Sequence, residues 1–200
     1  MSLIVYGHPF SSYTQKVLIA LHENDTPFEF RALGPDVPPA HAADWLQRWP
    51  LRKFPVLVDN GRTVAETSII IEHLQLAHPG PVKLLPADPA AALPVRFIDR
   101  FFDLHVMNAA QHAVDGALTG DEVKRRDGQT LAEQKLERAY AWLDTELAGR
   151  TWATGDAFTM ADCAAASALF YADWTHPMPE QYGLLGAYPA RLLARPFFAE

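Results

Sequence analysis

The sequence predicts a small α/β domain followed by a larger all-helical domain. Every convincing strand pattern, with its turn, falls within residues 1–78. After residue 89 the apolar residues keep helical spacing and no convincing strand appears. A run of Pro and Gly separates the two parts, so we expect a linker over residues 79–88 and a helical domain over residues 89–200.

The first part of the small domain reads as strand, helix and strand. Leu3–Tyr6 is a short apolar strand. A helix follows from about residue 13 to residue 22, and either Ser11 or Ser12 can cap it. Residues 28–33 alternate between apolar and polar and predict a second strand. Such a unit implies a right-handed crossover between parallel strands.

The second part of the small domain reads as a hairpin and a helix. Pro55–Val58 is an apolar strand, and Asp59–Gly61 is a tight-turn signal because Asn and Gly accept positive φ. Residues 62–65 return as a strand, and Thr67 or Ser68 can cap the helix that follows. With a weaker helix before the hairpin, the order of elements is thioredoxin-like.

The helical domain carries two capping-box patterns, over Thr130–Glu133 and Thr159–Asp162, and each predicts a helix start. A broad apolar face over residues 95–106 predicts a further helix, and residues 188–198 predict a last, short one.

Composition excludes several functions. The net charge is −7 and no basic patch stands out, so we expect no nucleic-acid partner. No apolar run reaches membrane-spanning length and no signal peptide is visible, so we expect no membrane association. The single cysteine, Cys163, fits a cytoplasmic protein. The eight histidines lack HExxH or CxxC context, which predicts no metal.

The hairpin and its helix place three chemical features together. A helix N-terminus with a hydroxyl at Thr67 attracts a carboxylate, and Glu66 offers an anion to an ammonium, a pair that suits an α-amino acid end. A cis Phe54–Pro55 bond would turn the backbone of Phe54 outward to pair with an extended peptide. The alternative is that Glu66 and Thr67 only cap a helix and Pro55 only starts a strand.

Three stretches together resemble the soluble (cytosolic) glutathione S-transferases over nearly the whole chain. They are GHPFSSYTQKVLIALHEND, KFPVLVD with ETSIIIEHL, and GDAFTMADCAA. The first is most similar to bacterial, serine-type members of the phi or zeta kind. The resemblance implies the glutathione S-transferase fold, with a glutathione-binding α/β domain, a helical domain that shapes a site for a small hydrophobic electrophile, and a homodimer.

The resemblance also implies roles for single residues. Ser11 falls on the serine whose hydroxyl meets the glutathione sulfur, with Ser12 and Tyr6 as rivals. Ser12 fits a pure helix cap, and Tyr6 fits a core aromatic. Phe54 precedes the cis-proline, Pro55, and would pair with the cysteinyl unit. The residues implied for the remaining parts of glutathione are Glu66 and Thr67 at the γ-glutamyl end and Lys53 and His41 near the glycyl carboxylate.

Two departures from the family pattern concern this region: Trp49-Pro50 replaces a frequent Asn-Pro, and Thr67 replaces a serine. Four residues are candidates to line the electrophile pocket, each with core packing as the alternative: Phe10, Phe102, His105 and Met107.

Three functions follow from the resemblance. The first is conjugation of the glutathione thiolate to a hydrophobic electrophile in detoxification. The second is a zeta-like, glutathione-dependent isomerase, suggested by the Ser11-Ser12 pair. The third is a glutathione-fold binding protein with little catalysis. Thiol transfer is disfavoured because residues 1–78 contain no cysteine.

Overall fold

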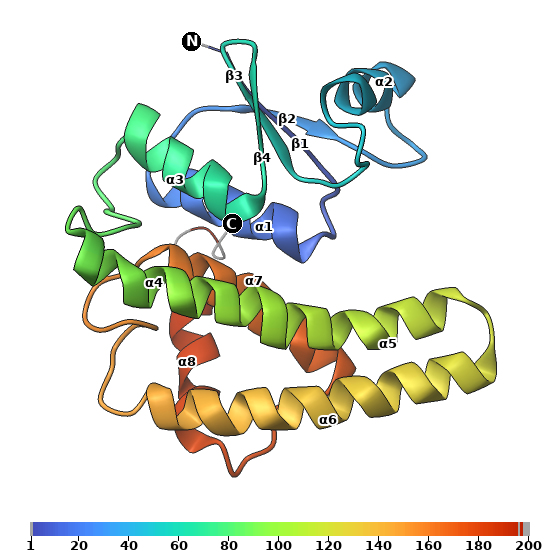
Figure 1. Ribbon diagram of the computed structural model, residues 1–200, viewed down its shortest axis with the longest axis vertical. Helices are drawn as coiled ribbons and strands as arrows, with labels where there is room; N and C mark the ends of the chain where they lie inside the picture. The colour runs from blue at the N-terminus through green and yellow to red at the C-terminus, as the bar shows by residue number, and fades with distance from the viewer. Residues whose placement is uncertain (1, 196, 198–200) are drawn as a thin grey trace. The chain divides into compact units, whose positions relative to one another are not determined.

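The computed structural model describes residues 2–195 and residue 197, and its chain forms two compact units, Met1–Leu85 and Pro86–Glu200. Figure 1 shows the strands gathered in the first unit and a bundle of helices in the second. The expected fold class, a thioredoxin-like α/β domain followed by an all-helical domain, is confirmed.

The first unit contains one four-stranded mixed sheet. Its elements are, in order, β1 (Leu3–Gly7), α1 (Ser12–Glu23), β2 (Glu29–Ala32), α2 (Pro39–Arg48), β3 (Val56–Asp59), β4 (Arg62–Ala65) and α3 (Thr67–Ala77). The strand order is β2-β1-β3-β4, with β1 parallel to β2 and the other pairs antiparallel. The four predicted strands, the parallel pairing of the first two and the hairpin are confirmed, with three of the strands shifted by one residue at one or both ends.

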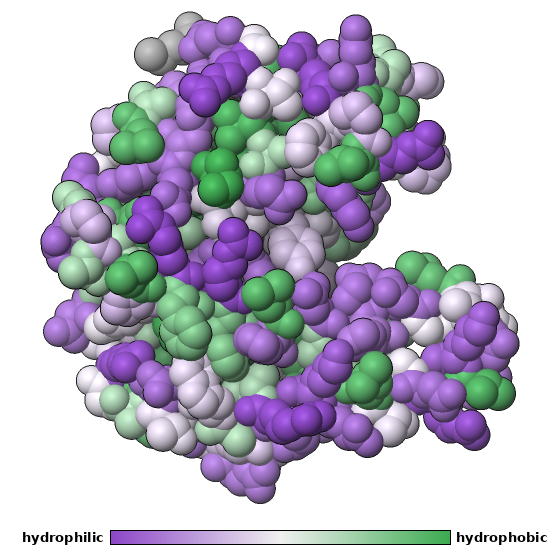
Figure 2. All heavy atoms as spheres, viewed as in Figure 1, coloured by the Kyte–Doolittle hydropathy of each residue, from purple (hydrophilic) through white to green (hydrophobic). Residues whose placement is uncertain are grey.

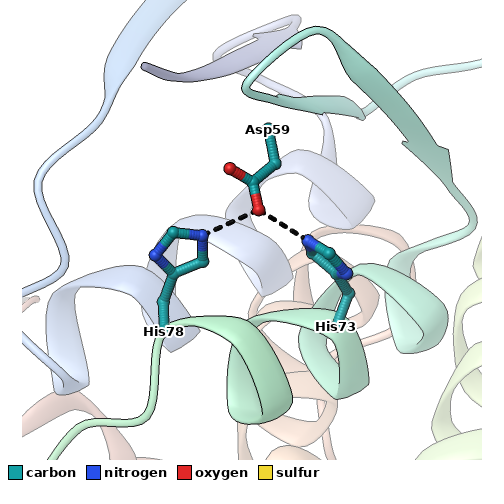
Figure 3. A group of neighbouring side chains, drawn as sticks. All are labelled: Asp59, His73 and His78. Atoms are coloured by element: carbon teal, nitrogen blue, oxygen red, sulfur yellow. Dashed lines mark hydrogen bonds and ion pairs between the residues drawn. The ribbon is translucent and has the colours of Figure 1, made fainter. Parts of the chain in front are cut away.

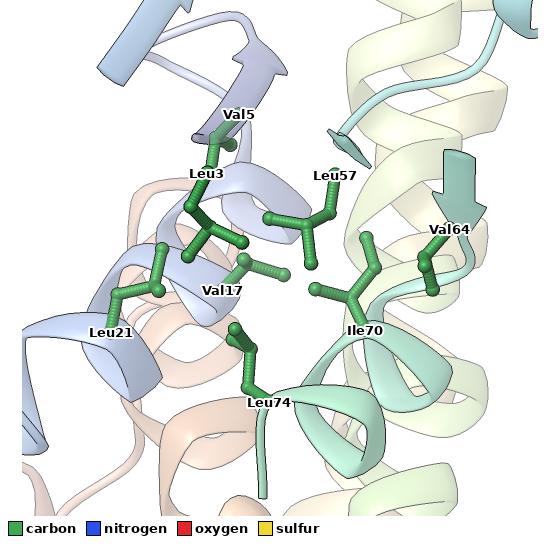
Figure 4. Close-up of a cluster of buried hydrophobic side chains, with 8 residues drawn as sticks. All are labelled: Leu3, Val5, Val17, Leu21, Leu57, Val64, Ile70 and Leu74. Carbon is green, nitrogen blue, oxygen red and sulfur yellow. The ribbon is translucent and has the colours of Figure 1, made fainter. Parts of the chain in front are cut away.

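Alternation along the strands divides the apolar side chains between the two faces of the sheet. On one face, α1 and α3 cover a core shown in Figure 4: Leu3, Val5, Val17, Leu21, Leu57, Val64, Ile70 and Leu74. On the other face, α2 lays Ala42, Trp45 and nearby Trp49 over a second cluster: Ile4, Tyr6, Leu33, Val56 and Val58. The sheet is therefore buried on both sides.

The structure decides one predicted helix start and corrects another. Ser11, one of the two predicted caps, is the N-cap of α1, and Ser12 is the first residue within that helix. Glu66 is the N-cap residue of α3, so neither Thr67 nor Ser68 caps it. In both cases the backbone conformation, which the residue types do not reveal, decides where the helix begins.

Part of the expected linker packs within the first unit. The side chain of Asn24 makes two hydrogen bonds with the backbone of Val82, and Leu84 and Leu85 are buried. The unit accordingly runs to Leu85.

The second unit is helical, with α4 (Pro89–Phe101), the π-helical turn η1 (Phe102–Met107), α5 (Asn108–Leu118), α6 (Glu122–Glu146), α7 (Met160–Thr175) and α8 (Gly183–Leu193). The capping box at Thr159 and Asp162 is confirmed. The box at Thr130–Glu133 starts no helix, because α6 already begins at Glu122 behind Asp121. The last helix begins before the expected 188 and ends at Leu193; Pro196 and Phe198 lie outside the described residues.

Among the described residues, no helix is long and apolar enough to cross a membrane. On the face of the helical unit visible in Figure 2, apolar side chains stand among polar ones.

Candidate active site

The sheet register brings three chain segments to one edge of the first unit. Tyr6 pairs with Val56, and Val56 pairs with Ala65. The end of β1, the start of β3 and the end of β4 therefore meet at the same edge. The segments that continue from these strand ends carry Ser11, the Phe54–Pro55 bond and Glu66.

Ser11 is held at the start of α1. Its backbone is extended (φ −89°, ψ 123°), and its side-chain oxygen accepts a hydrogen bond from the N–H of Thr14 at 3.2 Å. A hydroxyl that accepts one bond can still donate its own proton. A donor at a helix N-terminus, where the peptide dipoles favour negative charge, is suited to stabilise a thiolate.

Gly7 lets the end of β1 approach α1 closely. A Cβ at this position would lie 2.5 Å from the side chain of Thr14, so only glycine fits. This contact fixes the turn from β1 to Ser11.

Tyr6, the first rival of Ser11, faces α2. Its side chain is fully buried, its hydroxyl donates to Asp44, and it accepts from Nη1 of Arg31 at 2.6 Å. Burial, together with the hydrogen bond to Asp44, raises the pKa of Tyr6. The hydroxyl proton of Tyr6 is therefore used in the hydrogen bond to Asp44 and is not available to a ligand. Ser12, the second rival, is buried in the first turn of α1.

The Phe54–Pro55 peptide bond is cis. Pro55 is buried, whereas Phe54 is partly exposed. The indole N–H of Trp45 donates to the carbonyl of Lys53 at 3.0 Å and so anchors this loop to α2. The Phe54 ring lies between the rings of His8, 6.2 Å away, and Trp45, 6.1 Å away.

Glu66 has a left-handed backbone with φ 71°, a costly conformation for a residue with a side chain. Its exposed carboxylate makes no capping bond to α3. Thr67, the next residue, is buried. The fully buried Lys16 donates to the hydroxyl of Ser68 at 3.3 Å and ties α1 to the start of α3.

His41 and Lys53 occupy different elements. His41 lies in α2, with Nδ1 3.4 Å from the carbonyl oxygen of Ala32, the last residue of β2. Lys53 is exposed in the loop before the cis bond. Because Ala32 pairs with Gly7, the end of β2 lies at the same sheet edge as the other segments.

Sequence reasoning missed His8, Trp45 and Lys16. His8 was part of the quoted GHPF stretch, so its position before Ser11 was a usable signal. The role of Trp45 depends on a contact eight residues along the chain, and that of Lys16 on a contact with another helix, so neither could be read locally.

The electrophile candidates have different environments. Phe10 is 74% exposed beside His8, and His105 is exposed on η1, with its ring 4.9 Å from Phe101. Phe102 and Met107 are buried. A cavity of about 560 Å³ lies between α7 and α8, and its lining contains none of the four candidates.

Two family models match the chain. The model of the glutathione S-transferase N-terminal domain covers residues 5–82, and that of the C-terminal domain covers residues 107–190.

Several known proteins are similar to this chain. A crystal structure of a glutathione S-transferase from Methylobacterium radiotolerans, in complex with glutathione sulfonate, has 30% sequence identity and a TM-score of 0.82, with 100% of this chain and 93% of that chain covered. A probable maleylacetoacetate isomerase from Vibrio cholerae is 28% identical, over 100% of this chain and 95% of that protein. A probable glutathione S-transferase from Nicotiana tabacum is 30% identical over 66% of this chain, and the match spans 53% of the tobacco protein.

The architecture defines the class of protein: a thioredoxin-like domain joined to an all-helical domain. The matches identify it further, and the chain belongs to the glutathione S-transferase family.

Proposed function

We propose that the protein is a serine-type glutathione transferase that conjugates the glutathione thiolate to a hydrophobic electrophile. The observation that carries this proposal is the shared sheet edge. The pairing of Tyr6 with Val56 and of Val56 with Ala65 aligns three strand ends. Ser11 comes after the first of these ends, the cis Phe54–Pro55 bond immediately before the second, and Glu66 immediately after the third. This arrangement offers a hydroxyl donor, an outward-turned backbone and a carboxylate to one extended ligand.

The ligand is bound in three parts. The γ-glutamyl end has an ammonium, which pairs with Glu66, and a carboxylate, which the N–H groups and hydroxyl at the start of α3 receive. The backbone of Phe54 pairs with the cysteinyl unit. Lys53, through its ammonium, and His41 are assigned to the glycyl carboxylate.

The reaction requires the thiolate. A free thiol has a pKa of about 8.5, so only a small fraction is charged at neutral pH. A hydrogen bond from Ser11 and the N-terminal end of α1 favour the charged sulfur and lower the thiol pKa. The proton leaves to solvent, the sulfur forms a bond to the electrophilic carbon, and the leaving group departs with its electron pair.

Among the four electrophile candidates, Phe10 in the first unit and His105 in the second have exposed rings, and each is kept as a candidate for contact with the electrophile. His105 lies on a π-helical turn, a feature that occurs often at functional sites. Buried Phe102 and Met107 are assigned only to support such a surface by packing.

The proposal is tested by calorimetry with glutathione and by turnover with an activated aryl chloride such as 1-chloro-2,4-dinitrobenzene. We expect binding at or below the millimolar range and a thioether product. A protein that binds glutathione but leaves a panel of aryl halides, epoxides and enones unreacted is instead a binding protein with little catalysis.

A glutathione-dependent isomerase is the second candidate, favoured by the full-length similarity to the probable maleylacetoacetate isomerase. In an isomerase the thiolate adds to a conjugated double bond and is expelled again after rotation, so glutathione is not consumed. Incubating the protein with a cis-enedione acid and catalytic glutathione, and following the cis-to-trans conversion, separates the two functions.

We also propose that the protein acts as a homodimer in a reducing compartment such as the cytoplasm, where glutathione is kept as the thiol. Light scattering should give about twice the chain mass of 22.2 kDa.

A further inference from the structure

Three side chains of the first unit bring metal-binding atoms together (Figure 3). Oδ2 of Asp59 lies 2.9 Å from Nε2 of His73 and 2.8 Å from Nε2 of His78. The ligand atoms of all three residues lie within 4.8 Å of one another. Residues 2–195 and 197 contain no second group of three such side chains.

The fold assembles this cluster from two elements. Asp59 is the last residue of β3, His73 lies in the C-terminal half of α3, and His78 is the residue that caps that helix. The histidines are five residues apart and the aspartate is fourteen residues before the first, so no linear metal motif is present. This explains why the sequence predicted no metal.

We propose that Asp59, His73 and His78 form a binding site for a divalent transition metal ion, with Zn²⁺ as the ion to test. Two imidazoles and one carboxylate are a donor set that Zn²⁺ accepts, with a water in the fourth position. Ligands about 2.0–2.2 Å from a tetrahedral Zn²⁺ stand about 3.3 Å apart. The two distances from Asp59 to the histidines are about 0.5 Å shorter than that spacing, and all three ligand atoms already lie within 4.8 Å of one another.

The surroundings of the cluster meet two further requirements for a metal site. The Oδ1 atom of Asp59 accepts a bond from the side-chain amide of Asn60 at 2.8 Å, which orients the carboxylate as an outer-shell partner does. The cluster is also reachable from solvent. His78 lines a hollow of about 440 Å³, and His73 lines another of about 490 Å³.

The protonation states allow metal entry. A carboxylate only accepts, so Nε2 of each histidine now donates its proton to Asp59. Metal binding requires Nε2 without a proton, so each imidazole must give up this proton, either to its own Nδ1 or to solvent, when the ion enters. Binding needs no oxidant or other reactant. The three side chains are 10–16% exposed, so a bound ion would be largely shielded from solvent but could still exchange with it.

This site is separate from the proposed glutathione site. Pro55 precedes β3 and Asp59 ends it, while Glu66 begins α3 and His78 ends it. The two sites therefore lie at opposite ends of the same strand and the same helix. A bound ion would join the end of the strand to the end of the helix and stabilise the first unit, whether or not the protein is a transferase.

The test uses the full chain without a histidine tag, freed of metal with a chelator and titrated with Zn²⁺ at pH 7.5 by calorimetry. His73→Gln and His78→Gln are the variants of choice, because the Gln side-chain amide can still donate to Asp59 but is a poor metal ligand. His112→Gln is the matched control: His112 lies in α5 of the other unit and contacts Lys135.

We expect one Zn²⁺ per chain, an affinity at least tenfold weaker in either cluster variant, and an unchanged affinity in His112→Gln. Zn²⁺ should raise the melting temperature of the wild type and of His112→Gln only. Nitrogen NMR should show Nε2 of His73 and His78 losing its proton as Zn²⁺ is added. No heat at millimolar Zn²⁺, or equal affinity in the wild type and both cluster variants, would overturn the proposal.

Discussion

The hydroxyl oxygen of Ser11 accepts a hydrogen bond from the backbone N–H of Thr14 at 3.2 Å. This bond makes Ser11 both the cap of α1 and a side chain of fixed orientation, because the cap geometry holds the oxygen over the helix end. The remaining proton of the hydroxyl can then be donated to a ligand. The cap uses a lone pair of the Ser11 hydroxyl oxygen, whereas the catalytic role proposed for Ser11 uses the hydroxyl proton.

Substitutions at Ser11 should separate those two roles. Ser11→Ala should lose about 1 kcal/mol of stability and lower kcat about 10- to 100-fold, because both the cap and a bond to a charged sulfur are removed. Ser11→Asp should keep the cap but repel the thiolate, so stability returns while turnover stays low. Denaturant unfolding and kinetics on both variants provide the check.

Ser12→Ala is the matched control for Ser11, because Ser12 is the neighbouring serine inside the helix. Its kcat should stay within about twofold of the wild type. If Ser12→Ala loses turnover and Ser11→Ala does not, the catalytic assignment moves by one residue.

Tyr6→Phe should weaken the fold and leave the chemistry unchanged. The hydroxyl of Tyr6 is bonded to Asp44 and Arg31, and its removal takes one hydrogen bond from each of these charged groups. Asp44 keeps its bonds from Arg48 and Arg31. We expect a loss of about 1–3 kcal/mol in unfolding free energy. The kcat and KM for glutathione should remain near the wild-type values. A stable variant without turnover would make Tyr6 the thiolate donor.

Asp44 should contribute to the acid sensitivity of the first unit. The hydrogen bond from Tyr6, with Arg48 and Arg31 nearby, holds the pKa of Asp44 below its ordinary value of 3.8. A carboxyl with a lowered folded-state pKa stabilises the protein above pH 3.8, and this stability is lost as the pH falls through the folded-state pKa.

The stability difference between the wild type and Asp44→Asn should therefore be largest near pH 6 and shrink toward pH 3. Denaturant unfolding at a series of pH values measures it. A difference that stays constant over this range would show that the charge of Asp44 does not matter for folding.

Glu66 should strengthen glutathione binding at a cost to the stability of the fold. Glu66→Gly relieves the left-handed backbone, so the unfolding free energy should hold or rise by up to about 1 kcal/mol. The affinity for glutathione should fall about 10- to 100-fold, because a charge-assisted bond to the ligand ammonium is lost. Glu66→Gln should weaken binding without changing stability.

A glutathione analogue that lacks the α-amino group tests this assignment directly. It should bind the wild type and Glu66→Gln with equal affinity. If the substitution weakens the analogue as much as glutathione, then Glu66 acts on another part of the ligand.

Asp162 should be the most sensitive polar position of the helical unit. Its buried carboxylate accepts bonds from the backbone of Ala153, from the backbone and hydroxyl of Thr159 and from the hydroxyl of Tyr188. Asp162→Ala should cost about 3–5 kcal/mol, since several buried donors lose their acceptor. Thr159→Ala removes only part of the box and should cost about 1 kcal/mol. Equal losses would contradict this ranking.

Much of the fold could be predicted because its signals are local. The apolar run of β1, the Asn60-Gly61 turn and the capping box of α7 each depend on residues a few positions apart. The misleading signals were local as well. Thr130–Glu133 has the spacing of a capping box but lies within α6, where Gly128 packs directly against the backbone of α5. Packing between helices outweighed the cap preference.

Sequence by itself determined the order of elements and the residue types at the candidate active site, because strand periodicity, turn chemistry and motif spacing follow the chain. Only the tertiary structure decided that the hydroxyl of Tyr6 donates to Asp44, that Ser11 and not Ser12 caps α1, and that Asp59 contacts two histidines. Each of those depends on side chains from different elements meeting across the sheet or at its end. Such contacts follow from strand register and helix docking, which are set by the burial of the whole core and not by any one segment.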